Sequence, residues 1–431
     1  MVTAVVNLWY RWGLKAGLST ADQGLFSGAN FAFNILLARW LTPAEYGAFA
    51  VAFSIFLFMS GFYNALLLEP MSVLGPANHR YHLKQYLGCL IWIHGGITLG
   101  LAVLLLIGTR LFSLFAAQSP IISALFGLGI ALPFILFLWF FRRAFYIEHD
   151  PMGALSGSLL YGSLLIIGLI ILKTLHMISL ITAFLLMGLV SMIASGILFF
   201  RLKPNFINSY VMVNAGLKVV FRENWHYGRW VVGTTFVYWL SGNVYYIFIA
   251  GFLGFEETGA LRALQNFVLP LTQVMTALGL LLLPWVSGRF ANEGLDSLKR
   301  DVPKITTLIT GLAVAYFFGV SILGEPLIRL LYDGKYSAFI WLLPYLAAAP
   351  LISALGSGCQ LGLKAVQAPW AIFIAYCVSA AVTVSLGAVF VHLWGLKGAA
   401  IGGLFSLGSQ FPVIVWYWKR MANKKTDEIP I

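Results

Sequence analysis

The stretch ARWLTPAEYGA, Ala38–Ala48, places an arginine, a proline turn and a glutamate between two long apolar runs. A similar stretch, AGFLGFEETGA, occupies Ala250–Ala260 in the second half of the chain. The shared positions are each separated by 212 residues, with Ala38, Leu41, Glu45, Gly47 and Ala48 matching Ala250, Leu253, Glu257, Gly259 and Ala260. A turn repeated at a constant offset favours a chain built from two copies of one helical design.

The composition places this protein in a membrane. Of the 431 residues, 60% are hydrophobic and 10% are charged, and the mean hydropathy is +0.88. Soluble proteins carry about 25% charged residues, and no soluble core of this size could bury so much apolar surface. The apolar runs are continuous rather than alternating, which favours helices over a β-barrel. The sequence therefore predicts an all-α polytopic membrane protein.

Twelve apolar runs are long enough to cross a bilayer, which takes about 20 residues per helix. They lie near residues 20–41, 46–69, 85–108, 120–143, 153–173, 178–200, 227–251, 260–287, 305–324, 338–362, 369–392 and 396–418. In residues 1–17 the basic residues follow apolar ones, and no small-residue cleavage site comes after them. This start predicts an amphipathic segment on the membrane surface rather than a signal peptide.

The distribution of Lys and Arg predicts the orientation. If the N-terminus is cytoplasmic, 20 of the 27 basic residues, Arg80, Lys84, Arg142 and Arg143 among them, fall in cytoplasmic segments and 7 on the other side. The positive-inside rule then predicts that both termini are cytoplasmic. The same rule accounts for the net charge of +12, and no nucleic-acid-binding motif is present, so nucleic acid is not expected as a partner.

The longest internal cytoplasmic segment, residues 201–226, is expected to be an amphipathic linker at the membrane surface. It separates an N-terminal lobe, residues 1–200, from a C-terminal lobe, residues 227–431, with six predicted spans in each. Six is even, so the lobes share one orientation. We expect two parallel six-helix lobes around a central cavity, an arrangement that suits alternating access.

Polar residues concentrate in the first two predicted spans of each lobe. Because such groups are costly in lipid, they are candidates for function. In the first span they follow the helical period and share one face. The candidates for lining a substrate cavity are Asn30, Asn34, Asn243, Tyr246, Gln265 and Asn266. Hydrogen bonding between neighbouring helices is the competing interpretation of each residue.

Two arginines lie near the outer ends of predicted spans, Arg39 in the first and Arg262 in the eighth. An arginine fork binds phosphate oxygens in pairs, so both are candidates for binding an anionic head group. The competing interpretation is that each side chain reaches toward the membrane surface.

Two acidic residues, Asp22 and Glu69, lie toward the cytoplasmic ends of the first two spans. Each is a candidate for binding a proton or a sodium ion that drives transport. The alternative is an ion pair with Arg80 or Lys84.

The sequence argues against an enzyme and against a bound cofactor or metal. It contains no GxxxxGK[ST], HExxH or GxSxG motif, so an ATP-driven pump or a hydrolase is not expected. Cys89, Cys359 and Cys377 lie in apolar runs with no CxxC pair, which predicts small buried hydrophobic residues rather than a disulfide framework or a zinc site.

Several motifs resemble one family of bacterial transporters. They are ARWLTPAEYGAFA from Ala38, FLGFEETGALRALQNFVLP from Phe252, LIRLLYDGKYSAFIWLLPYLA from Leu327 and WGLKGAAIG from Trp394. These resemble prokaryotic polysaccharide transporters, the O-antigen and exopolysaccharide repeat-unit flippases of the multidrug/oligosaccharidyl-lipid/polysaccharide exporter superfamily. The resemblance extends over nearly the whole chain.

The resemblance implies two six-helix lobes around a cationic cavity in the bacterial inner membrane. It also implies a lipid-linked oligosaccharide, carried on polyprenyl pyrophosphate, as the substrate, and a proton or sodium gradient as the driving force. Membrane lipids and a polysaccharide polymerase or glycosyltransferases are the expected partners. Deep intramembrane cations are fewer here than that family pattern implies.

Three functions remain open on the sequence. The first is a lipid-linked oligosaccharide flippase for surface or exopolysaccharide (lipopolysaccharide-type) synthesis. The second is an ion-coupled exporter of drugs or other small molecules with the same fold. The third is a membrane scaffold of a polysaccharide assembly complex that transports nothing itself.

Overall fold

A computed structural model describes residues 2–204 and 206–423, with the backbone alone described at residues 2–16, 206–215, 230 and 280. The chain forms two compact units. Unit 1 comprises Met1–Leu41 and Ala52–Phe236, and unit 2 comprises Thr42–Val51 and Val237–Ile431. Two helices, α2 and α8, therefore begin in one unit and end in the other.

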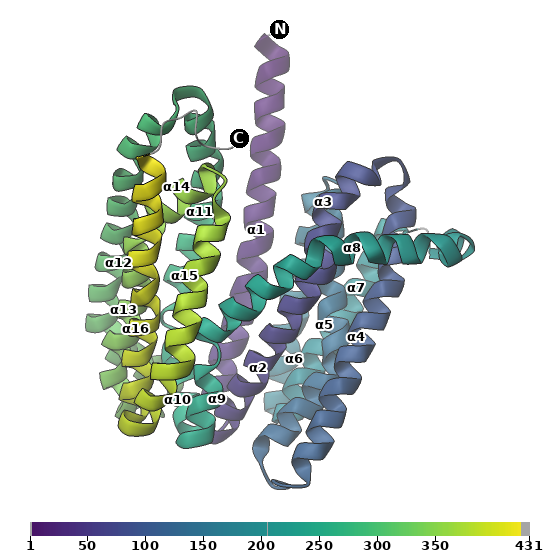
Figure 1. Cartoon of the computed structure of the whole chain (residues 1–431). Helices are drawn as coiled ribbons and strands as arrows, with labels where there is room; N and C mark the ends of the chain where they lie inside the picture. The colour runs from purple at the N-terminus through teal and green to yellow at the C-terminus, as the bar shows by residue number, and fades with distance from the viewer. Residues whose placement is uncertain (1, 205, 424–431) are drawn as a thin grey trace. The chain divides into compact units, whose positions relative to one another are not determined.

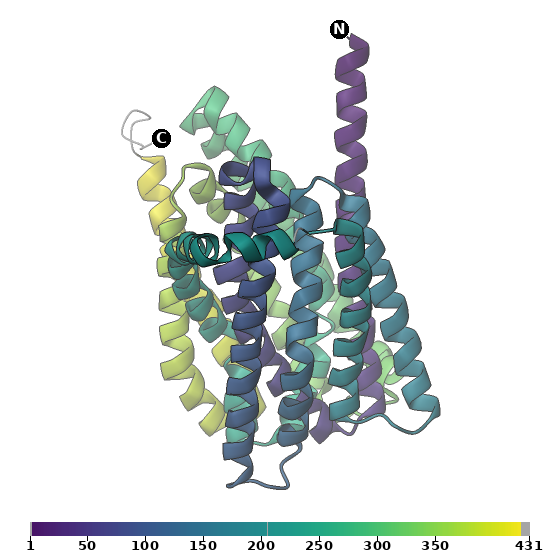
Figure 2. The same cartoon turned by 90° about the vertical axis from the view of Figure 1, so that its right-hand side faces the viewer.

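Unit 1 is a helical bundle (Figure 1). Its elements are α1 (Val2–Trp40), most of α2 (Pro43–Tyr63), the π-helix η1 (Asn64–Leu68), α3 (Glu69–Asn78), the 3₁₀ turn η2 (Arg80–His82), α4 (Leu83–Ser113), α5 (Pro120–Ile147), α6 (Pro151–Thr174), α7 (Leu180–Leu202) and most of α8 (Phe206–Gly242). Within the unit α5 packs on α4 and α7, and α1 packs on α6. In Figure 2, which shows the same bundle from the side, most of its helices run nearly parallel and the first part of α8 lies across them.

Local sequence accounts for the helix starts and for the close packing in unit 1. Asp150 precedes α6 and its side chain accepts a hydrogen bond from the Gly153 amide at 3.1 Å, a helix cap. Between α5 and α7 the backbones approach closely, because a Cβ atom at Gly188 would lie 2.9 Å from Ala131 Cα. Small residues permit such contacts where helices meet in a membrane.

Unit 2 is also helical. After the first part of α2 and the end of α8 it contains α9 (Tyr245–Phe252), α10 (Phe255–Gln265), α11 (Leu269–Glu293), α12 (Leu295–Tyr332), the 3₁₀ turn η3 (Ser337–Leu342), α13 (Leu343–Leu355), α14 (Ser357–Ala365), α15 (Pro369–Val382), the π-helix η4 (Thr383–Gly387) and α16 (Ala388–Ala422). Leu298, Val302, Leu363 and Ala371 belong to its buried apolar core.

The repeated turn has a simple local basis. Between α1 and α2, the Glu45 carboxylate accepts hydrogen bonds from the Thr42 amide and hydroxyl at 2.9 and 2.8 Å, and Thr42 Oγ1 accepts from the Glu45 amide at 3.2 Å. This is a capping box with proline at the first helical position. In the second copy the chain turns at Gly254, whose φ of +118° suits glycine. Both copies end one helix and begin the next at equivalent positions, Trp40 and Pro43 in the first, Phe252 and Phe255 in the second.

The all-α membrane fold is confirmed. Among the described residues, nine segments are long and apolar enough to span a bilayer, and they cover ten of the twelve predicted spans. Two predicted spans form one such segment, Pro369–Ala422, which is interrupted at Gly395 with a φ of +59°. The predicted first and seventh spans are the two outside this set. The first is rich in polar residues, Asp22, Asn30 and Asn34 among them, and the seventh is divided between two helices.

Several segments differ from the sequence-based expectation. The predicted eighth span, 260–287, is one of them, because α10 ends at Gln265 and α11 begins at Leu269. Residues 2–17 are not a separate surface segment in the backbone, since α1 is one helix from Val2 to Trp40; side chains 1–16 lie outside the described residues. The predicted seventh span, 227–251, is broken between α8 and α9 near Asn243. Of the predicted linker 201–226, residue 205 and the side chains of 206–215 lie outside the described residues.

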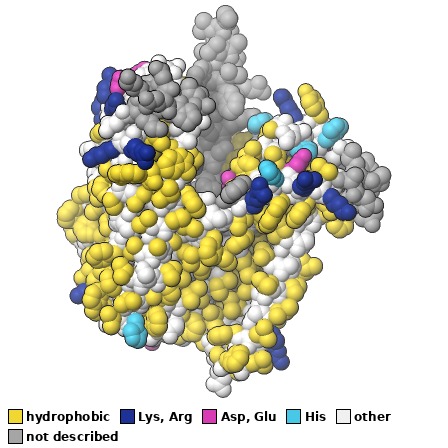
Figure 3. Space-filling model, viewed as in Figure 1, with side chains coloured by type: hydrophobic (Ala, Val, Ile, Leu, Met, Phe, Trp, Pro, Cys, Tyr) yellow, Lys and Arg dark blue, Asp and Glu magenta, His cyan; other side chains and the backbone are white. Residues whose placement is uncertain are grey.

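The surface of each unit is that of a membrane protein. Large apolar side chains are exposed, among them Leu104 and Ile107 on α4, Leu281 on α11 and Ile322 on α12. Figure 3 shows hydrophobic side chains covering most of the visible surface, with most Lys and Arg side chains gathered toward its upper end. Exposed apolar helices flanked by charged ends are expected where lipid is the solvent.

Candidate functional site

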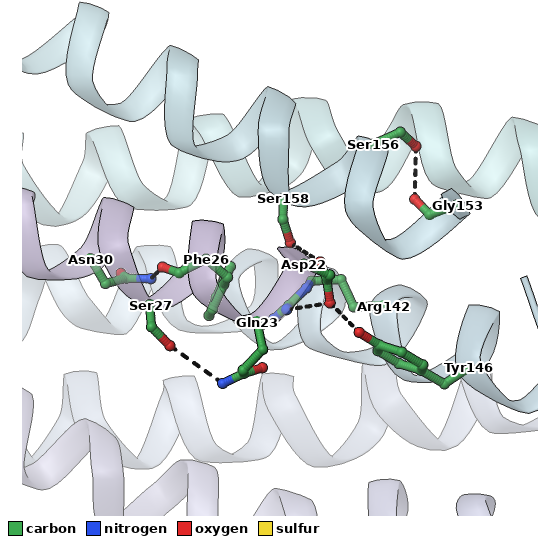
Figure 4. A network of polar contacts seen from close by, with 10 residues as sticks. All are labelled: Asp22, Gln23, Phe26, Ser27, Asn30, Arg142, Tyr146, Gly153, Ser156 and Ser158. Atoms are coloured by element: carbon green, nitrogen blue, oxygen red, sulfur yellow. Dashed lines mark hydrogen bonds and ion pairs between the residues drawn. The ribbon is translucent and has the colours of Figure 1, made fainter. Parts of the chain in front are cut away.

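Asp22 on α1 is the centre of a buried ionic network in unit 1 (Figure 4). Its carboxylate is fully buried and forms an ion pair with Arg142 Nη2 at 2.8 Å. Tyr146 and Ser158 donate hydrogen bonds from their hydroxyls to the two carboxylate oxygens. The sequence-based pairing of Asp22 with Arg80 or Lys84 is wrong, because Arg142 on α5 takes that place.

The sequence analysis counts Arg142 only among the basic residues that orient the chain and does not predict it as a site residue. In the structure it lies inside α5 with 8% of its surface exposed. Its guanidinium stacks on the Phe26 ring, 3.8 Å from the centroid. Adjacent residues on a helix point about 100° apart, so Arg143 is exposed while Arg142 meets α1.

The polar face predicted on α1 continues from Asp22 toward the C-terminal end of the helix. Asn30 Nδ2 donates to the Phe26 carbonyl at 2.8 Å, and Asn30 Oδ1 accepts from the Tyr161 hydroxyl at 3.0 Å. Asn34 is buried and its Nδ2 donates to the Asn30 carbonyl at 2.9 Å. Its Oδ1 is buried with no hydrogen-bond partner among the described residues. A buried acceptor without a hydrogen-bond donor is energetically costly.

The other two unit 1 candidates lie away from Asp22. Glu69 begins α3 and accepts a long hydrogen bond from the Tyr227 hydroxyl at 3.4 Å. Arg39 is half-buried in the last turn of α1, where a cation is favoured by the helix dipole. Neither of them contacts the Asp22 network in any described hydrogen bond.

In unit 2 the candidates Tyr246, Gln265 and Arg262 meet. Arg262 has 8% of its surface exposed, and its Nη1 donates to the Tyr246 hydroxyl at 3.0 Å. That hydroxyl in turn donates to Gln265 Oε1. The Tyr246 ring centroid lies 5.7 Å from the guanidinium carbon. These phenol contacts orient the guanidinium without cancelling its charge.

Asn266 belongs to a second hydrogen-bond network, next to that of Arg262. The amide is buried and its Nδ2 donates to the hydroxyls of Tyr46 and Tyr332 at 3.1 and 3.2 Å. The Tyr332 hydroxyl donates a hydrogen bond to the Ala263 carbonyl at 3.1 Å, and the Tyr46 hydroxyl is within hydrogen-bonding reach of Arg262. Asn266 Oδ1 is a second buried acceptor with no partner among the described residues.

The sequence analysis missed both tyrosines, although Tyr46 belongs to the repeated turn and Tyr332 to the LLYDGKY motif. Asn243 is linked to Tyr246 through the backbone, since its carbonyl accepts a hydrogen bond from the Tyr246 amide at 3.4 Å. It lies at the break between α8 and α9 and lines a separate cavity of about 460 Å³ in unit 2. The predicted residues therefore divide among Asp22 and its α1 neighbours, the Arg262–Asn266 networks, and this cavity.

Comparison with known proteins places this geometry in context. The sequence profile of a family described as "Polysaccharide biosynthesis protein" matches residues 101–340, more than half of the chain. No curated protein matches this chain. Among the solved structures that match, three with sequence identities of 13% to 16% illustrate the shared fold.

The first is an inward-facing multidrug resistance MATE family transporter of the MOP superfamily, 13% identical, with a TM-score of 0.79 over 93% of this chain and 94% of its own. The second is the lipid II flippase MurJ in an inward closed conformation, 15% identical, with a TM-score of 0.76 over 93% and 87%. The third is a eukaryotic MATE transporter, 16% identical, with a TM-score of 0.64 over 99% of both chains.

Proposed function

The chain belongs to the polysaccharide biosynthesis protein family, and from this premise we propose that it is a flippase for a lipid-linked oligosaccharide. It moves a polyprenyl-pyrophosphate-linked repeat unit across a bacterial inner membrane for surface or exopolysaccharide synthesis. The observation that carries the proposal is the family match over residues 101–340 in a chain with a transporter fold.

The physical need for such a protein is clear. A glycan and a pyrophosphate cannot cross hydrocarbon unaided, because burying unpaired polar and charged groups costs many kcal/mol. The polyprenyl tail can remain in lipid throughout. Two lobes that open alternately to either side would shield only the polar head of this substrate.

Arg39 and Arg262 are assigned to the pyrophosphate in this proposal. A guanidinium fork binds two phosphate oxygens at once. Arg262 supports the assignment because it is nine-tenths buried and held in place by the Tyr246 hydroxyl. Arg39 supports it by its position at the end of α1, in the turn that the sequence repeats.

Asn30, Asn34, Asn243, Tyr246, Gln265 and Asn266 would hydrogen-bond the glycan. The support comes from two orphan acceptors, Asn34 Oδ1 in unit 1 and Asn266 Oδ1 in unit 2. A buried amide oxygen without a partner costs about 1–3 kcal/mol. A sugar hydroxyl, which both donates and accepts, would satisfy either one.

Asp22 and Glu69 are assigned to ion coupling. A proton on Asp22 would neutralise the carboxylate that holds Arg142 and would release the arginine from its ion pair. Glu69 accepts a long hydrogen bond from Tyr227 at 3.4 Å and interacts electrostatically with Arg143, so protonation of its carboxyl would weaken both interactions. Protonation of either residue would link transport to a gradient.

The proposal also includes a place in the cell. We infer two parallel six-helix lobes, residues 1–200 and 227–431, joined by residues 201–226, with both termini in the cytoplasm. A polysaccharide polymerase and glycosyltransferases would act on the same lipid-linked substrate and are the proposed partners.

Reconstitution tests the function. The purified protein is placed in liposomes with a fluorescent lipid-linked oligosaccharide, and glycan on the far leaflet is measured with and without a proton or sodium gradient. We expect transfer by the wild type and at least a tenfold loss in Arg262→Lys, which keeps the charge but loses the fork. Arg329→Ala is the matched control, because Arg329 lies in an exposed pair with Glu325 at 2.6 Å.

Absence of transfer under every gradient would refute the flippase. A second candidate, an exporter of cationic drugs, is favoured by the buried carboxylate of Asp22 and by the fold shared with a multidrug transporter. Gradient-driven export of an organic cation such as ethidium, without glycan transfer, would establish it instead. Failure of both assays, with a polymerase co-purifying, would favour a scaffold.

A further inference from the structure

The cavity of about 460 Å³ in unit 2 has a composition unlike the arginine networks. It lies among α8, α11, α13, α14, α15 and α16, and its volume is within the range of about 300–1,000 Å³ typical of small-molecule sites. Hydroxyl and amide groups dominate its polar lining, from Tyr238, Asn243, Thr276, Ser357, Gln360 and Gln410.

The charges around this cavity exclude most alternatives. Among its described lining residues Lys364 is the one charged side chain, and it is exposed; no carboxylate is among them. Divalent metal ions such as Ca²⁺ and Mg²⁺ are recognised chiefly by carboxylates. Hydroxyls and amides each offer donors and acceptors, which suits a neutral ligand rich in hydroxyl groups.

An aromatic wall completes the match to a sugar. The Tyr238 and Tyr376 rings meet edge to face with centroids 5.3 Å apart, and Tyr238 is 57% exposed. One face of a pyranose ring carries mainly C–H groups, so it packs on an aromatic ring while the hydroxyls at its edge form hydrogen bonds. Both elements are present in this one cavity.

Hydrogen bonds from residues outside the cavity hold part of its polar lining in place. Gln410 is buried and its Nε2 donates to Ser379 Oγ at 2.9 Å, and Ser379 is paired with Ser406 at 3.0 Å. Thr383, which begins the π-helix η4, donates to the Ser241 carbonyl at 3.1 Å. Groups fixed before the ligand arrives lose less entropy on binding, and π-helices occur frequently at functional sites.

We propose that this cavity is a binding site for a neutral sugar ring of the transported glycan. The inference rests on the proposed function for its choice of ligand. It adds a subsite for the sugar in unit 2 that is distinct from the arginines assigned to the pyrophosphate, and it predicts binding of a free sugar without its lipid.

Gly279 provides the test. A Cβ atom built at Gly279 meets nothing within 4 Å, so Gly279→Leu can direct its side chain into the cavity and occupy part of the space that a ligand needs. Gly288 lies on the same helix α11, is equally open, and does not line the cavity. Gly288→Leu is therefore a control matched in helix, residue type and added volume.

Binding is measured by saturation-transfer NMR in lipid nanodiscs free of sugar detergents. The probes are glucose, galactose, N-acetylglucosamine and N-acetylgalactosamine, with tetraphenylphosphonium as the organic cation. We expect transfer to at least one sugar in the wild type and in Gly288→Leu, and loss of that signal in Gly279→Leu. Gln360→Leu, which removes an amide without added bulk, should weaken the same signal.

No sugar signal in the wild type, or an equal signal in Gly279→Leu, would overturn the inference. So would a tetraphenylphosphonium signal that Gly279→Leu removes. The liposome assay separates this outcome from the proposed function. Glycan transfer without sugar binding would support the flippase function and refute the sugar site in the cavity. Sugar binding without glycan transfer would support the sugar site and refute the flippase function.

Discussion

Gly47 and Gly259, the glycines of the two repeated turns, pack against each other in unit 2. A Cβ atom at Gly47 would lie 1.7 Å from the Phe255 carbonyl oxygen and 2.9 Å from the Gly259 nitrogen. A Cβ atom at Gly259 would lie 2.2 Å from the Pro43 carbonyl oxygen and 3.0 Å from the Gly47 nitrogen. The contact is reciprocal under the offset of 212 residues, as in a two-fold interface. The two copies of the repeated turn therefore contact each other directly, through α2 and α10.

Alanine at either glycine should destabilise the protein. The added methyl group would meet backbone atoms, which cannot rotate away, so the two helices would have to separate. We expect a loss of about 1–3 kcal/mol for each variant, the usual cost of overpacking. Thermal unfolding in detergent, followed by tryptophan fluorescence, measures it.

Gly251→Ala is the control for this pair, because it lies in the same repeated turn and its Cβ would meet nothing within 4 Å. Alanine in a helix is otherwise favourable by about 0.5–1 kcal/mol, so this variant should be neutral or more stable. Equal midpoints for Gly47→Ala and Gly251→Ala would mean that the close approach does not exist.

Much of the fold follows from composition and period. The apolar runs and the turns at Pro43 and Gly254 are local features, and the helices begin and end near them. The packing of Gly47 on Gly259 is not local, since it joins residues 212 positions apart. A repeat in sequence predicts a repeated shape, but nothing in the sequence requires the two copies to touch.

The candidate site was less predictable, for a similar reason. Asn34 was identified because a polar face on an apolar helix is visible in one segment, and Asp22 because an acidic residue in an apolar span is a candidate for ion binding. Arg142 was not predicted as a site residue because the Arg142–Arg143 doublet ends an apolar run, as orienting charges do. Its role depends on contacts with Asp22 and Phe26, which are distant in sequence. Tyr46 and Tyr332 were missed because tyrosines are common at membrane surfaces, and only their meeting at Asn266 distinguishes them.

Glu148, between α5 and α6, should make stability depend on pH. Burial raises the pKa of its carboxyl above the ordinary value; Asp150 also raises it, and Lys84 opposes the shift. A carboxyl whose pKa is raised in the folded state contributes stability fully below the unfolded pKa, and this contribution is lost as pH rises through the folded pKa.

Glu148→Gln should remove that dependence, because glutamine stays neutral. We expect its thermal midpoint to match the wild type below about pH 4 and to exceed it at about pH 8. Midpoints are measured in detergent across this range. A variant less stable than the wild type at the higher pH would show that the ionised carboxylate is stabilised in the fold.

The amide of Asn266 should be coupled energetically to Tyr332. Tyr332→Phe removes the hydroxyl that accepts from Asn266 and donates to the Ala263 carbonyl, so we expect a loss of about 1–3 kcal/mol. Tyr81→Phe is the control, because Tyr81 is 93% exposed and its hydroxyl is already in solvent. Surface changes of this kind cost less than about 0.5 kcal/mol.

A double-mutant cycle with Asn266→Leu isolates this contact. If the two groups interact, the cost of Tyr332→Phe should fall in the Asn266→Leu background, with a coupling of about 0.5–3 kcal/mol. Additive losses would mean that the Tyr332 hydroxyl acts only through Ala263.

The pair Asp22–Arg142 should be the most costly ionic contact to break. Asp22→Asn leaves a buried guanidinium without its counter-charge, and such losses cost about 3–5 kcal/mol. The exposed pair Glu325–Arg329 provides the comparison, since Glu325→Gln should cost no more than about 1 kcal/mol. Removing both partners in Asp22→Asn with Arg142→Gln should cost less than the sum of the single changes, because no unpaired charge remains.

Transport by the same variants separates a structural ion pair from a coupling site. If Asp22 only holds α1 against α5 and α6, transfer by Asp22→Asn in liposomes should fall in proportion to the folded fraction, and a proton gradient should still accelerate it. If protonation of Asp22 drives the cycle, the folded variant should still equilibrate the labelled lipid between leaflets but should no longer respond to the gradient. A gradient response equal to that of the wild type would remove Asp22 from the coupling mechanism, and Glu69→Gln would then be the next variant to measure.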